Sequence, residues 1–187
     1  MGSGRAAPPP MRTLEESGFR VSVPESDSFR LADLEPYREL SGRHLKEMDL
    51  GWWDVPRARL LLLELKGREI WDEFDREREG AHAHLLASLE TKANDVLLIL
   101  AAVWSGTETG KRLAALLPPR ARAYPGDKKL KLVFLVDTPA RRRELLGPVK
   151  DALRNRLAGR LALFGAAAIV LADDETAMKM GLPVARL

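Results

Sequence analysis

The spacing of apolar residues along the chain predicts four helices. The longest pattern begins near Ala83, repeats every three or four residues and stops at Ser105-Gly106. An earlier pattern starts at Asp27 or Ser28, which are suitable N-caps, and ends at Ser41-Gly42. The predicted helices cover residues 27–41, 83–104, 111–117 and 139–157.

Alternating and uninterrupted apolar runs predict strands over 44–53, 57–66, 129–137 and 166–171. The first two strands are separated by Asp54-Val55-Pro56, and because proline favours a turn they form a hairpin. The four leucines at 60–63 indicate a strand buried on both faces in the middle of a sheet. The order of elements predicts an α/β protein, a three-layer sandwich with a central mixed β-sheet.

The chain of 187 residues has the length of one domain with a substantial core. We expect residues 1–24 to form a flexible N-terminal tail and residues 25–187 to form a single α/β domain. No apolar run approaches the roughly 18–20 residues that span a bilayer, so we expect no membrane partner. The lack of cysteine excludes a thiolate metal site and a cysteine nucleophile, and it is compatible with the reducing cytoplasm, where we expect the protein to act.

Charge is distributed unevenly along the chain. Residues 120–160 contain twelve Lys or Arg and four Asp or Glu, a net charge of +8, whereas residues 64–95 contain five basic and nine acidic residues, a net charge of −4. A basic surface beside an acidic site suits a polyanion that is handled with metal ions. Solvated helix faces explain the same counts, so the charge alone does not distinguish a polyanion-binding surface from ordinary exposed helices.

The hairpin carries the residues that indicate chemistry. Glu64 and Lys66 are two residues apart on one strand and therefore share a face, and the hairpin brings Asp49 alongside them. Two carboxylates at the end of apolar strands favour a hard divalent cation, to which the carbonyl of Leu65 adds another oxygen. Such a metal clamps a phosphate and activates water, while a nearby lysine balances developing charge. This is the equipment for hydrolysing a phosphodiester.

Asp49, followed fifteen positions later by Glu64-Leu65-Lys66, resembles the signature of the PD-(D/E)xK nuclease superfamily. The resemblance implies a restriction-endonuclease-like core, made of a helix, a hairpin-bearing sheet, a helix and a strand, here with a C-terminal α-β extension. It implies that Asp49 and Glu64 bind Mg²⁺ or Mn²⁺ and that Lys66 is the catalytic lysine. It also implies an assisting acid on the first helix, Glu39 or Glu35, and a lysine from the long helix, Lys92. The substrate would be nucleic acid, DNA rather than RNA, and a chain this short leaves room for a homodimer or a partner protein.

Two features of the sequence depart from this signature. Met48 stands where the family often has proline, and Asp54 competes with Asp49 for the role of first ligand. We prefer Asp49 because Asp54 falls in the predicted turn. The third strand expected before the long helix is not evident, because residues 69–80 are too charged for a buried strand.

Arg141, Arg142 and Arg143 begin a predicted helix and are candidates for contacts with nucleic-acid phosphates. Other motifs favour structural roles. Residues 106–112 imitate a phosphate-binding loop but lack one residue of its spacing and its Ser or Thr, so we interpret them as a helix-to-helix turn. We interpret residues 173–175 as a turn or helix cap, and His82 and His84 as structural or solvent-exposed residues.

A second hypothesis belongs to a different class of protein. The chain would then be a non-catalytic α/β module that binds nucleic acid or another protein and holds no metal, and Asp49, Glu64 and Lys66 would be a structural ion pair network. The sequence leaves both hypotheses open.

Overall fold

The centre of the structure, a computed structural model that describes residues 9–76, 80–166 and 168–187, is a five-stranded sheet. In sheet order its strands are β3 (Ser28–Phe29), β4 (Leu50–Asp54), β5 (Arg59–Lys66), β6 (Leu130–Val136) and β7 (Ala168–Ala172). The pairs β3·β4 and β4·β5 are antiparallel, whereas β5·β6 and β6·β7 are parallel. The predicted mixed sheet and the predicted hairpin are both confirmed.

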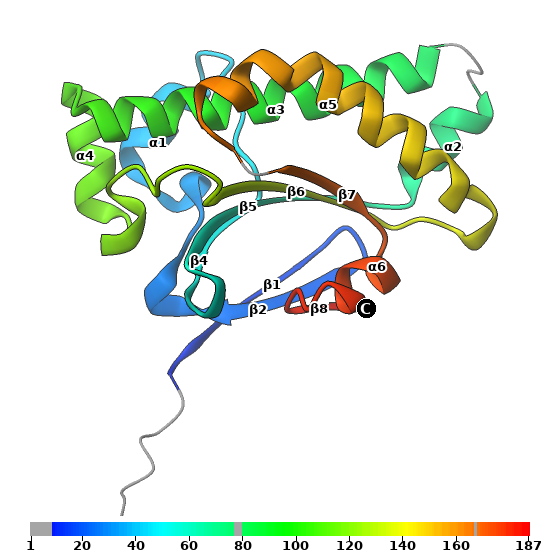
Figure 1. Ribbon diagram of the computed structural model, residues 1–187, viewed down its shortest axis with the longest axis horizontal. Coiled ribbons are helices and arrows are strands. Elements are labelled where there is room, and N and C mark those ends of the chain that lie inside the picture. Colours follow the sequence, from blue (N-terminus) through cyan, green and yellow to red (C-terminus); the bar gives the residue numbers. More distant parts are fainter. Residues whose placement is uncertain (1–8, 77–79, 167) are drawn as a thin grey trace, which may run out of the picture.

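A second, smaller sheet is antiparallel and lies against the first. Its strands, in sheet order, are β1 (Met11–Glu16), β2 (Phe19–Pro24) and β8 (Val184–Arg186). Figure 1 shows this sheet on one side of the five-stranded sheet and most of the helices on the other side. The protein therefore has three layers, and one outer layer is mainly a β-sheet.

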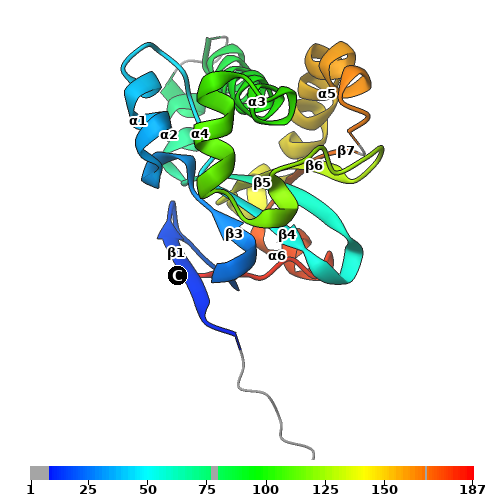
Figure 2. The same ribbon diagram turned by 90° about the vertical axis from the view of Figure 1, so that its left-hand side faces the viewer.

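The helical layer covers the opposite face of the five-stranded sheet. Its helices are α1 (Glu35–Ser41), α2 (Glu69–Arg76), α3 (Gly80–Ser105), α4 (Glu108–Leu116) and α5 (Leu146–Leu163), while α6 (Asp174–Lys179) lies on the side of the small sheet. Figure 2 shows α3 and α5 above β5, β6 and β7. In the part of the chain that the structure describes, no helix is long and apolar enough to cross a membrane.

Strand β5 separates two hydrophobic cores. Leu60 and Leu62 point into the core beneath the helices, and Leu61, Leu63 and Leu65 point into the core shared with the small sheet. All five are at most 3% exposed, as expected for a strand buried on both faces. Because side chains alternate along a strand, Glu64 and Lys66 continue the row that faces the helices.

The prediction of a flexible tail over residues 1–24 is wrong for residues 11–24, which form β1 and β2. The two strands pair in full register, and the turn between them places Ser17 and Gly18 at positive φ. Every second residue from Phe19 to Val23 is buried against the main sheet, so apolar alternation drives the pairing. Residues 1–8 of the predicted tail lie outside the described residues.

The first helix is shorter than predicted. Ser28 and Phe29 form β3 and pair with Trp52 and Gly51, and the helix begins only at Glu35, with Pro36 in its first turn. Proline suits that position because an N–H in the first turn of a helix has no partner within the helix, so its absence removes no hydrogen bond. The charged segment after β5 forms helix α2, so among the described residues no strand lies between β5 and α3.

We predict that Gly51→Ala destabilises the fold by about 1–3 kcal/mol, because it overpacks the contact between β3 and β4. A Cβ at Gly51 would lie 2.2 Å from Cζ of Phe29. Urea denaturation measures the change in the free energy of unfolding. The control is Gly159→Ala in α5, where a Cβ meets nothing within 4 Å. This control should stabilise the protein by about 0.5–1 kcal/mol, and equal effects of the two substitutions would contradict the prediction.

Candidate functional site

The hairpin and helix α3 bring four charged side chains together. Strand β4 begins one residue after Asp49, and its first residue, Leu50, pairs with Leu63 of β5. Asp49 therefore lies beside the end of β5, where Glu64 and Lys66 face the helices. The structure places the predicted Asp49, Glu64 and Lys66 in one cluster, as the hairpin argument requires.

Glu64 is the centre of this cluster and is 0% exposed. The Nζ atom of Lys92, from α3, lies 2.6 Å from Oε1 and 2.8 Å from Oε2 of Glu64. The Nζ atom of Lys66 lies 2.9 Å from the same Oε1. Oε1 nevertheless makes no aligned hydrogen bond in the described part of the chain. Two ammonium groups thus neutralise the buried carboxylate without saturating its oxygens.

Asp49 is held by the backbone of the next strand. Its Oδ2 accepts a hydrogen bond of 2.6 Å from the N–H of Leu65, and its Oδ1 lies 3.6 Å from Nζ of Lys92. Its carbonyl oxygen accepts a hydrogen bond of 3.2 Å from Nε of Arg30. The Asp49 side chain thus accepts the hydrogen bond of a β5 N–H at a position that lies before the first residue of β4.

The carbonyl of Leu65 points toward the same edge, because the N–H and C=O of one strand residue share a direction. The hydroxyl of Ser17, in the β1–β2 turn, donates a long hydrogen bond of 3.5 Å to this oxygen. Sequence reasoning missed Ser17 because it assigned that segment to a flexible tail. The dipeptide Ser17-Gly18 between two alternating apolar runs is the turn signal that could have found it.

Burial sets the electrostatics of the cluster. Desolvation, followed by the charge of Asp49, raises the pKa of Glu64 to about 7, against the opposing effect of Lys66 and Lys92. Desolvation lowers the pKa of Lys92, but the charges of Glu64 and Asp49 raise it more, so that its pKa lies above the usual value. The cluster therefore combines a carboxyl group that titrates near neutral pH with a firmly cationic lysine.

The donor types of this cluster match those that a hard divalent cation takes. The carboxylates of Asp49 and Glu64 and the carbonyl of Leu65 are oxygen ligands, and Mg²⁺ is usually held by one or two carboxylates together with waters. The unsaturated Oε1 of Glu64 is a further point of agreement. Against this, no group of three or more His, Cys, Asp or Glu in the described ranges could hold a metal, and Lys92 lies between the two carboxylates.

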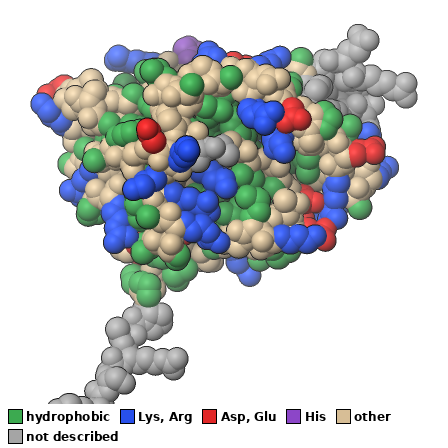
Figure 3. All heavy atoms as spheres, in the orientation of Figure 1, with side chains coloured by type: hydrophobic (Ala, Val, Ile, Leu, Met, Phe, Trp, Pro, Cys, Tyr) green, Lys and Arg blue, Asp and Glu red, His purple; other side chains and the backbone are tan. Residues whose placement is uncertain are grey.

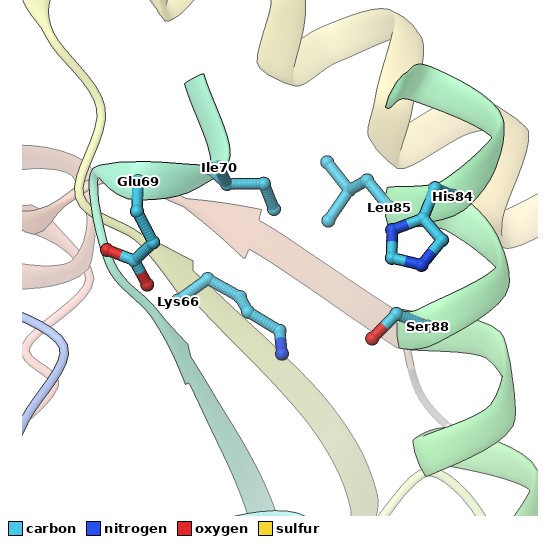
Figure 4. Close-up of a pocket in the computed structure, with 6 residues that line it drawn as sticks. All are labelled: Lys66, Glu69, Ile70, His84, Leu85 and Ser88. Atoms are coloured by element: carbon cyan, nitrogen blue, oxygen red, sulfur yellow. The ribbon is translucent and has the colours of Figure 1, made fainter. Parts of the chain in front are cut away.

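Two cavities flank the cluster, and each is bordered by one of its lysines. A cavity of about 150 Å³ lies between Lys66, α2 and α3, and Figure 4 shows the side chains of Lys66, His84 and Ser88 around it. A cavity of about 360 Å³ lies beside Lys92, on the side of Lys46. His84 and Ser88 line both cavities. The cluster thus opens to solvent along the first half of α3.

The other acids proposed from the sequence lie elsewhere. Glu39 forms a two-pronged ion pair with Arg112 of α4, at 2.7 and 2.9 Å, and this hydrogen bonding lowers the pKa of Glu39. Glu35 lies on the same helix near Arg112. Asp54 lies at the far end of β4 and pairs with Arg57 at 3.2 Å and Arg59 at 3.1 Å. Of the predicted assisting residues, the structure brings only Lys92 to Glu64.

The three arginines proposed for nucleic-acid contacts lie in a 3₁₀ helix over Ala140–Leu145. Arg143 is engaged by acids of α6, with its Nε 2.6 Å from Asp173 and its Nη1 on Glu175. Asp173 also caps α6 by accepting a hydrogen bond from the N–H of Thr176, as the helix-cap interpretation expected. Contacts of Arg141, Arg142 and Arg143 with nucleic acid remain a prediction.

In the loop-like motif over residues 106–112, the turn between the two helices is only Gly106 and Thr107, and residues 108–112 already belong to α4. Thr107 caps α4, and its hydroxyl accepts a hydrogen bond from the N–H of Gly110. The side chain of His82 lies outside the described residues.

Comparison with known proteins identifies no relative. The chain has no significant match among protein-family models, curated proteins or solved structures. No family or relative therefore supports the resemblance to nucleases.

We predict that Glu64 makes the stability of the protein pH-dependent. Its raised pKa means that the folded protein holds a proton between pH 4.5 and about 7, where the unfolded chain has released it. The free energy of unfolding should therefore fall as pH rises through this window, by at most about 3 kcal/mol at about 1.4 kcal/mol per pH unit.

Urea denaturation at several pH values in EDTA tests this prediction, with Glu64→Gln as the comparison. The difference in stability between the two proteins should change across the window in favour of the variant as pH rises. Carboxyl carbon NMR of Glu64 gives the titration directly. A midpoint near 4.5 would contradict the prediction.

Proposed function

We propose that this protein is a metal-dependent nuclease that hydrolyses phosphodiester bonds in nucleic acid, DNA rather than RNA. The observation that carries the proposal is the convergence of Asp49, Glu64 and Lys66 at the end of a central strand, with Lys92 added from α3. The order of α1, the β4–β5 hairpin, α3 and β6 also follows the order of the PD-(D/E)xK core that the sequence resembles.

In this proposal Asp49, Glu64 and the carbonyl of Leu65 hold Mg²⁺ or Mn²⁺. The metal supplies charge for the phosphate oxygens and lowers the pKa of a bound water. Lys66 is 23% exposed and lines a cavity, so its ammonium group can contact a phosphate there and stabilise the charge that develops during hydrolysis. Lys92 contacts both oxygens of Glu64 and favours its ionised form.

One observation favours the alternative of a non-catalytic module. Counted formally, with both carboxyl groups ionised, Asp49 and Glu64 balance the positive charges of Lys66 and Lys92, so the cluster is neutral without a metal. Networks of this kind occur as structural ion pairs, and removal of one partner then mainly costs stability. The two proposals differ in whether the protein binds a divalent cation at Glu64.

We predict metal-dependent cleavage that is lost in two variants. Labelled single- and double-stranded DNA and RNA are incubated with Mg²⁺, Mn²⁺ or EDTA. Wild type should cleave DNA only with metal, and Glu64→Gln and Lys66→Ala should each lose at least about a hundredfold in rate. The metal should also raise the melting temperature of wild type but not that of Glu64→Gln, because ligands stabilise the state that binds them.

Asp54→Asn is the matched control for Glu64→Gln. Asp54 is also a buried carboxylate held by two cations, but it lies at the opposite end of β4. This variant should lose stability and keep both cleavage and the effect of metal on melting. Wild type that neither cleaves nor responds to metal would favour the non-catalytic module.

A further inference from the structure

The reactive groups of the site lie below the molecular surface. Glu64 is fully buried, Asp49 is 10% exposed, and Lys66 and Lys92 are 23% and 22% exposed. Both lysines contact Glu64, and each borders a cavity of limited size. The cavity beside Lys92, at about 360 Å³, has the scale of a site for a small ligand, and the cavity beside Lys66, at about 150 Å³, is smaller.

Helix α3 forms one wall of each cavity with both polar and apolar side chains. The polar residues of this wall are His84 and Ser88, which line both cavities, and Thr91, which lines the larger one. Their spacings of four and three residues place them as a stripe on one face of the helix, together with Lys92. Lys46 borders the larger cavity from the opposite side. These groups offer hydrogen bonds and positive charge to a phosphate chain that runs along the helix.

The shape of the site discriminates between forms of nucleic acid. Duplex DNA is stiff, with a persistence length of about 50 nm, and its bases are stacked inside the helix. It cannot follow a recessed path between α3 and the sheet unless base pairs open, which costs free energy. A single strand bends freely and can place one phosphate at a time beside Lys66 and Lys92.

We propose that the substrate of this site is a single strand, or the unpaired end of a duplex, lying along the His84–Ser88–Thr91 stripe of α3. This inference rests on the proposed nuclease function for its chemistry, but its binding component can be measured separately. Discrimination comes from the depth of the site and not from base recognition. The stripe makes Ser88 and Lys46 positioning residues for the strand.

Fluorescence anisotropy tests the binding component. The probes are a fluorescein-labelled 20-mer of single-stranded DNA and its blunt duplex, each titrated with the full chain in Ca²⁺ buffer. We expect the single strand to bind at least about tenfold more tightly, which corresponds to about 1.4 kcal/mol. In Mg²⁺ the single strand should also be cleaved at least about tenfold faster than the duplex, since the duplex must first open.

Two variants test whether the nucleic-acid strand lies along α3. Ser88→Trp fills the shared wall of the cavities, and Lys46→Ala removes a cation from the rim, so both should weaken single-strand binding severalfold or more. Leu98→Trp adds the same side chain at a position of α3 that is 61% exposed, and Lys129→Ala removes an exposed lysine at the other end of the sheet. These two controls should bind as wild type does. Circular dichroism confirms that each variant is folded, and Lys46→Ala carries the test if Ser88→Trp is not.

The outcomes separate this inference from the proposed function. Equal binding and equal cleavage of single strand and duplex would overturn the inference and leave the nuclease proposal intact. Selective single-strand binding that is lost in both variants, without cleavage in any metal, would support the strand path and overturn the nuclease. Selective binding that both variants retain would overturn the path along α3.

Discussion

Burial of β5 on both faces is the constraint on which the site depends. Helices cover one side of this strand and the small sheet covers the other, so that its leucines are almost completely removed from water. Near the end of this strand, Glu64 lies on the helical side, where its carboxylate is fully buried. A buried charge is costly unless it is paired, and the two lysines meet that requirement. The charge cluster is thus a consequence of where the strand ends.

Packing of α3 decides which residue completes the cluster. Leu89, Ala93 and Val96 are at most 1% exposed and fix the rotation of the helix over the sheet. Lys92 precedes Ala93 and lies at the side of this buried face. Its side chain reaches Glu64, near the end of β5. The same rotation turns Ser88 toward the cavities. The hydrophobic core therefore sets the geometry of the polar site.

The hairpin, the buried central strand and the pairing of Asp49 with Glu64 and Lys66 could be predicted from the sequence, because they depend on period-two alternation and on one turn. Lys92 entered only through the resemblance to a family, since the contact of one helix residue with a distant strand depends on tertiary packing. The predicted tail is wrong for residues 11–24, because the prolines and small residues that precede them indicate a loop. Phe19, Val21 and Val23 nevertheless alternate as the buried residues of a strand do. Ser28 and Phe29 form a strand and not the start of a helix, because they pair with β4. Local propensity cannot reveal this pairing, since it depends on a distant part of the chain.

The balance of charge in the cluster determines what a divalent cation would have to do. The carboxylates of Asp49 and Glu64 already contact lysine ammonium groups. A cation can therefore bind their oxygens only if Lys66 and Lys92 lose part of these contacts. Each lysine borders a cavity, and a flexible four-carbon side chain can turn its ammonium group into that space. A phosphate entering the same cavities offers the displaced ammonium groups a new anionic partner. Metal binding and substrate binding would then support each other, because each removes the cost that the other imposes on the lysines. A structural ion pair needs no cavity beside either lysine, so the two cavities are an observation in support of the proposed hydrolysis.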